Sequence, residues 1–193
     1  MIVIENYLEQ DQLRKIREEQ YWQEPLAGRF IVKDFWNLAS DQLMFHYFAQ
    51  EMFVMGAKRN TLLDKALEIS DGIEWWTHKF PNTYPNGSQR KGLDWHCDKD
   101  EGLFQAEGII LKPLAVAVLY VHEDIDLETM GKLEIKFGPG QQYTQEIDPK
   151  PNRCVIFDGS LEHRVTEGTN EVARRSLIAN LWGMPIRNIR GKV

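Results

Sequence analysis

Apolar residues in the first 71 positions recur near helical spacing, after a short β-prone start at Ile2–Ile4. The first predicted helix follows directly, with Leu8 and Leu13 among its apolar positions. Ser40 can cap a second helix, and a third is predicted over Thr61–Ile69. We therefore expect residues 1–71 to be mainly helical, and no candidate chemistry is visible among them.

From Gly72 onward the pattern changes to short β-prone runs separated by segments rich in glycine, proline, asparagine and aspartate. No helix is indicated between these runs, which favours an antiparallel sandwich or a small barrel. The chain is predicted to be α+β, a single domain over residues 1–193, in which residues 1–71 support a β-core at 72–185. The runs predicted as strands are Ile73–Phe80, Leu93–Cys97, Leu114–His122, Lys132–Phe137, Arg153–Phe157, Arg164–Thr166 and Ser176–Trp182.

The amino-acid composition disfavours some classes of protein but does not indicate a function. Lysine and arginine total 23 against 29 aspartates and glutamates, so the net charge is 23 − 29 = −6. An acidic chain without a basic tail argues against nucleic-acid and anionic-membrane partners. The N-terminus lacks a basic segment followed by an apolar run, and Cys97 and Cys154 are too few for a disulfide framework. These features favour a cytoplasmic protein without membrane spans, and they leave the oligomeric state open.

Candidate chemistry begins at His96 and Asp98, two positions apart in a β-prone run. On a strand this spacing turns both side chains to one face and Cys97 to the other. An imidazole nitrogen and a carboxylate oxygen can then reach one metal ion. Alone the pair is a weak signal, because a surface turn explains it as well.

His163 supplies a second imidazole, at the point where a later β-prone run ends in a turn. A third ligand arriving from a distant strand is what a facial site of two histidines and one carboxylate requires. Nitrogen and carboxylate ligands without thiolate favour Fe(II) over structural zinc. His96, Asp98 and His163 are therefore the predicted metal ligands and catalytic centre.

Arg174 and Ser176 share one face of the last predicted strand. A guanidinium buried beside a metal requires an anion, and a dicarboxylate co-substrate that chelates the metal at one end would supply it. We expect Arg174 to bind the far carboxylate and Ser176 to assist it, because they share a face, but the double arginine leaves Arg175 as the alternative. A surface strand with two solvated arginines explains these residues equally well when they are considered alone.

Taken in order, these motifs resemble the 2-oxoglutarate/Fe(II) oxygenase superfamily, and within it the prolyl-4-hydroxylase-like branch. The resemblance extends to the strand–helix start VIENYLEQDQLRKI, to GKLEIKF, to PKPNRCVIFDGSLEHRV and to RRSLIANLW. It implies a double-stranded β-helix, or jelly-roll, of antiparallel strands supported by the N-terminal helices. It also implies Fe(II), 2-oxoglutarate as co-substrate and dioxygen.

The chain departs from the family pattern in two places. The paired glycine of the family is here Met130-Gly131, and the long segment before His96 obscures which tyrosine would contact the co-substrate. By resemblance, Tyr84 and Tyr120 are the candidates. Because Asp98 retains the carboxylate that halogenating relatives lack, the resemblance implies hydroxylation.

Several readings of the function stay open at this point. The branch suggests a prolyl residue of a peptide or protein as substrate, but related enzymes hydroxylate free amino acids or other small molecules. A non-catalytic metal-binding module of the same fold is the main alternative. A cupin-like metalloenzyme is another, although it would leave Arg174 without a role.

Overall fold

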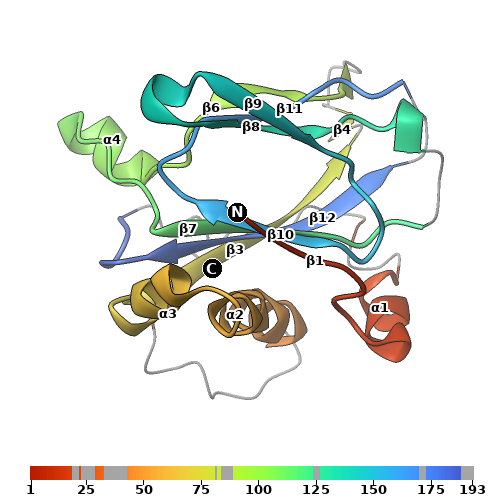
Figure 1. The fold of residues 1–193 in the computed structure, drawn as a ribbon, viewed down its shortest axis with the longest axis horizontal. Helices are drawn as coiled ribbons and strands as arrows, with labels where there is room; N and C mark the ends of the chain where they lie inside the picture. Colours follow the sequence, from red (N-terminus) through yellow and green to blue (C-terminus); the bar gives the residue numbers. More distant parts are fainter. Residues whose placement is uncertain are drawn as a thin grey trace.

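Helices and antiparallel sheets form three layers in the computed structural model of the chain, which describes residues 1–18, 22, 29–32, 43–80, 82–83, 89–123, 127–169 and 173–187. Figure 1 shows the N-terminal helices on one face of a large sheet and a smaller sheet on its other face. The predicted combination of helices and antiparallel strands is confirmed.

The N-terminal helices pack their apolar faces against the large sheet. Leu13 and Ile16 of the first helix and Met52 and Phe53 of the second are buried in one apolar cluster with it. The predicted cap at Ser40 lies outside the described residues. None of the helices in the described ranges is long and apolar enough to cross a lipid bilayer. The helices are α1 (Gln10–Ile16), α2 (Leu43–Ala57) and α3 (Thr61–Glu68), followed later in the chain by α4 (Glu101–Glu107) and two 3-10 turns, Leu127–Thr129 and Pro139–Gln141.

The large sheet has six strands in the order β1-β10-β7-β12-β3-β2. Its central strands are covered on both faces, which explains why Ala115–Tyr120 is buried along its whole length. The β-prone start of the chain joins this sheet as an edge strand beside β10. The strands are β1 (Ile2–Ile4), β2 (Arg29–Val32), β3 (Gly72–Phe80), β7 (Ala115–Tyr120), β10 (Cys154–Asp158) and β12 (Arg174–Trp182).

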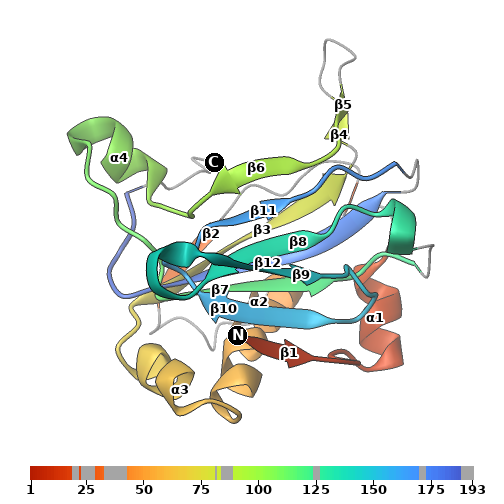
Figure 2. The ribbon, with the colours of Figure 1, turned by 45° about the horizontal axis from the view of Figure 1, so that its top comes forward.

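The small sheet has four strands in the order β6-β11-β8-β9, and a two-stranded hairpin of β4 and β5 precedes it. Leu133, Ile135 and Ile147 of this sheet share a buried cluster with Val118 and Ile178 of the large one. The second apolar core therefore lies between the sheets. Figure 2 shows the strands of both sheets from a second direction. The strands are β4 (Asn82–Thr83), β5 (Gln89–Arg90), β6 (Leu93–His96), β8 (Leu133–Phe137), β9 (Tyr143–Ile147) and β11 (His163–Val165).

Three details differ from the sequence prediction, the first being strand β9, which was not predicted. The prediction of no helix among the strands is wrong, because α4 lies between β6 and β7. Asp100 caps this helix by accepting a hydrogen bond from the Leu103 N–H, and Gly108 ends it in the left-handed conformation. Strand β6 also ends at His96, so Asp98 lies in the segment that leads to this cap.

Candidate metal and co-substrate site

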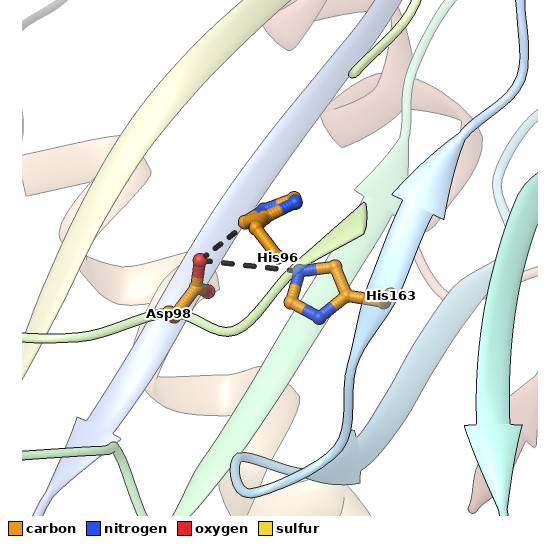
Figure 3. A group of neighbouring side chains, drawn as sticks. All are labelled: His96, Asp98 and His163. Atoms are coloured by element: carbon orange, nitrogen blue, oxygen red, sulfur yellow. Dashed lines mark ion pairs between the residues drawn. The ribbon is translucent and has the colours of Figure 1, made fainter. Parts of the chain in front are cut away.

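His96, Asp98 and His163 come together at one edge of the space between the sheets (Figure 3). Strands β6 and β11 are antiparallel neighbours, and their register places His96 directly opposite His163. The Oδ1 atom of Asp98 lies 3.6 Å from Nε2 of His96 and 3.9 Å from Nε2 of His163. The three donor atoms lie within 4.8 Å of one another. Ligand bonds of about 2.1 Å to one ion would place neighbouring donors ~3 Å apart, so only a small contraction is needed.

Both imidazoles are oriented by the backbone. Nδ1 of His96 lies 2.7 Å from the Asp94 carbonyl, and Nδ1 of His163 lies 3.2 Å from the Leu161 carbonyl. When Nδ1 donates to these carbonyls, Nε2 keeps its lone pair and faces Asp98. This is the tautomer that a metal ion requires.

The electrostatics of the triad also favour a cation. Burial lowers the pKa of His163 below its ordinary value, against the opposing effect of the Asp98 carboxylate, so the ring stays neutral near pH 7. Oδ2 of Asp98 is buried and has no hydrogen-bond partner among the described residues. An unpartnered carboxylate oxygen beside two imidazole nitrogens fits a divalent metal ion.

Arg174 lies on the inner face of the large sheet, 5% exposed. One guanidinium nitrogen donates to the Gly131 carbonyl at 2.6 Å, and the group stacks over the Phe80 ring at 5.0 Å. Its Nε has no partner, and no acidic side chain of the described residues pairs with it. Burial lowers the pKa of this guanidinium. Within the described ranges, Arg174 is therefore a buried positive charge without an acidic side chain to compensate it.

Two hydroxyl groups lie beside Arg174. Tyr120 and Ser176 are paired across β7 and β12, so both side chains share the inner face with Arg174. Burial raises the pKa of Tyr120 to about 12, although the Arg174 charge opposes this shift, and the phenol therefore remains a hydrogen-bond donor. Together these groups are hydrogen-bond donors on one face of the sheet, which suits a carboxylate.

Arg175 lies on the opposite face of β12. It donates to the Arg17 carbonyl at 3.1 Å and stacks over the Trp22 ring at 5.7 Å, on the helical side of the sheet. Of the two neighbouring arginines, only Arg174 faces the space between the sheets. Tyr84, the other tyrosine predicted to contact a co-substrate, lies outside the described residues.

Sequence reasoning missed three residues of this region. Phe157 places its ring 5.1 Å from that of His163. His122 follows β7 at the position that would continue the pairing opposite Arg174, and burial lowers its pKa to about 4. Asn180 is a buried amide on the inner face of β12. Only Asn180 had a local signal, because it interrupts the apolar run LIANLW.

No family model matches the sequence, and no curated protein matches it. Several solved structures are similar to this chain. A prolyl-4-hydroxylase from Pseudomonas putida has 16% identity and a TM-score of 0.59, with 95% of this chain and 92% of that chain covered. A prolyl hydroxylase from Trichoplax adhaerens, in complex with a peptide fragment of hypoxia-inducible factor, has 12% identity and a TM-score of 0.59, covering 94% and 83%.

A non-heme alpha-ketoglutarate-dependent epimerase of nogalamycin biosynthesis is also similar, with 12% identity, a TM-score of 0.53 and coverage of 92% and 75%. The likeness to the prolyl-4-hydroxylase-like branch, indicated by the sequence motifs, is therefore confirmed for the fold. At these identities the comparison concerns the fold, and function has to be argued from the site.

Proposed function

We propose that the chain is an Fe(II)- and 2-oxoglutarate-dependent dioxygenase that hydroxylates its substrate. The observation that carries this proposal is the pairing of two features on facing sheets. Three side chains that could hold a metal ion lie on the small sheet and the segment after β6, and Arg174 lies buried on the inner face of the large sheet without an acidic partner among the described residues. A metal site alone would not need that guanidinium. A dicarboxylate that bridges the two would explain both.

His96, Asp98 and His163 would hold the iron on one side and leave the remaining positions to co-substrate and dioxygen. The bound iron and 2-oxoglutarate would supply the oxidant that replaces a substrate C–H by C–OH, with succinate and carbon dioxide as co-products. The protein contributes the orientation of the ligands, through the Asp94 and Leu161 carbonyls.

Arg174 would bind the far carboxylate of 2-oxoglutarate, with the hydroxyls of Ser176 and Tyr120 as further donors. A carboxylate there offsets the cost of the buried positive charge. The apolar residues Val118 and Ile178 lie on the same face of the sheet as Arg174. They would exclude water between Arg174 and the bound metal. The carbon chain of the co-substrate would lie against them.

We further propose a jelly-roll core within a single domain and a residue of a peptide or protein, such as proline, as substrate. Support comes from the Trichoplax adhaerens neighbour, which was solved with a peptide fragment. The edge of the two sheets at the triad is open enough to leave His96 partly exposed, with 31% of its side chain accessible. A free amino acid would fit the same chemistry and is the second substrate class to test.

The test is the release of succinate by the iron-loaded protein with 2-oxoglutarate in air. We expect slow succinate formation alone, faster formation with a peptide substrate, and a mass increase of one oxygen atom on that peptide. Asp98→Ala should abolish all three, because it removes one of the three proposed metal ligands. Wild-type protein that binds iron but never forms succinate would contradict the proposal and indicate a metal-dependent binding module.

A further inference from the structure

Two buried polar groups on β12 have no hydrogen-bond partner among the described residues, and neither belongs to the metal or Arg174 site. They are Oδ1 of Asn180 and Nε1 of Trp182. Asn180 is 2% exposed and Trp182 is fully buried. Buried side-chain polar groups almost always have a hydrogen-bond partner. Two unpaired groups so close in the chain therefore require an explanation.

Both groups point to the same face of the sheet. Strand β12 pairs with β3 without interruption from Arg174 to Trp182, so its side chains alternate strictly between the faces. Asn180 and Trp182 therefore share the inner face with Arg174 and with Ile178, which packs between the sheets. The Cα atoms of Asn180 and Trp182 are expected to be ~6.8 Å apart along the strand.

The register also places Asn180 at the metal end of the strand. Asn180 is paired with Val116 on β7, and Val116 is paired with Phe157 on β10. The Phe157 ring contacts the metal-ligand candidate His163. Asn180 thus lies two strands from Phe157, ~10 Å along one row of the sheet. In the proposed function the Arg174 end would hold the co-substrate, and Asn180 lies six residues along β12 from Arg174, toward the metal-ligand candidates.

The two unpaired groups have complementary hydrogen-bonding roles. The Asn180 carbonyl oxygen is an acceptor, and the indole N–H of Trp182 is a donor. We infer that Asn180 and Trp182 form a substrate subsite that binds an amide, accepting from its N–H and donating to its carbonyl. The inference rests on the proposed function and makes its substrate class more specific. A peptide backbone supplies both groups, whereas a free amino acid offers a charged ammonium and carboxylate.

The experiment follows the indole N–H of Trp182 in ¹⁵N-labelled protein, with its signal assigned from Trp182→Phe. The probes are blocked tripeptides, acetyl-Gly-X-Gly-amide with X covering each amino acid, and the corresponding free amino acids. Spectra are recorded with and without Zn(II) and 2-oxoglutarate. We expect at least one tripeptide to shift the Trp182 signal, while Trp75, on the opposite face of the sheet beneath α2, stays unchanged.

Asn180→Leu tests the acceptor. It should melt at the same temperature as the wild type or higher, because it removes an unpartnered buried group, and it should bind that tripeptide about tenfold more weakly. Binding of the tripeptide with undiminished affinity, or no response of Trp182 to any probe, would overturn the subsite. The readout needs neither iron nor turnover. A shifted Trp182 in a protein that forms no succinate would therefore refute the proposed function while the subsite stands.

Discussion

Replacing Arg174 by methionine should stabilise the fold and abolish its response to 2-oxoglutarate. Arg174 is 5% exposed, and no acidic side chain of the described residues compensates its charge. Removing a buried charge of this kind relieves a penalty of several kcal/mol. The Gly131 carbonyl loses its hydrogen bond from the guanidinium, which costs about 1–3 kcal/mol. The net change should be an increase of about 1–2 kcal/mol in the free energy of unfolding.

Binding of the co-substrate should also raise the free energy of unfolding, but only in protein that keeps Arg174. At a concentration one hundred times its dissociation constant, a ligand that binds only the folded state adds about 2.7 kcal/mol to stability. Anaerobic wild-type protein with Fe(II) should gain that amount from 2-oxoglutarate, and Arg174→Met should gain nothing. Since about 1 kcal/mol moves the melting temperature of a domain of this size by 2–4 °C, calorimetry resolves both effects.

Arg175→Met is the matched control, because Arg175 is the neighbouring arginine on the helical face of β12. It should keep the full response to 2-oxoglutarate. An Arg174→Met variant destabilised by several kcal/mol would refute the reasoning, since it would mean that the guanidinium is already compensated within the fold. A variant that still gains stability from 2-oxoglutarate would refute it as well.

Three further predictions concern the supporting structure. The pKa of His122 is about 4, so the folded state loses stability as pH falls from about 6.5 toward 4. His122→Gln should lose about 3 kcal/mol less over that interval, measured by urea unfolding at both ends. Gly131→Ala would place its Cβ 1.8 Å from the Thr166 carbonyl oxygen and should prevent folding, as read by circular dichroism. Asp100→Ala removes the cap of α4 and an acceptor for the Arg187 N–H, so amide exchange in α4 should rise and stability should fall by about 1–3 kcal/mol.

The strands and the metal ligands could be predicted because each has a local signal. Buried strands such as Ala115–Tyr120 appear as apolar runs between turn-formers. The spacing of His96 and Asp98 and the distal position of His163 suggested a metal site, and the structure brings their donor atoms together, although Asp98 lies beyond the end of β6. Strict alternation along β12 likewise predicted that Arg174 and Arg175 face opposite sides.

Other features depend on contacts that the sequence does not display. Strand β9 was missed because four of its five residues are exposed, so it lacks an apolar alternation. The signals of α4, Asp100 and Gly108, are also typical of loops. The position of His122 beside Arg174 follows from long-range register. Whether the Asn180 side chain has a hydrogen-bond partner depends on every element packed around it. A local sequence pattern does not contain that information.

The most direct test of the account is the visible charge-transfer absorption of anaerobic protein mixed with Fe(II) and 2-oxoglutarate. The account predicts a band in the wild type that is absent in Asp98→Ala, which loses the metal carboxylate. At the 2-oxoglutarate concentration that gives the full wild-type band, Arg174→Met should give no band, because it keeps the triad but loses the far anchor. Well-folded, iron-loaded wild-type protein without any such band would contradict the central claim that this site holds Fe(II) and 2-oxoglutarate together.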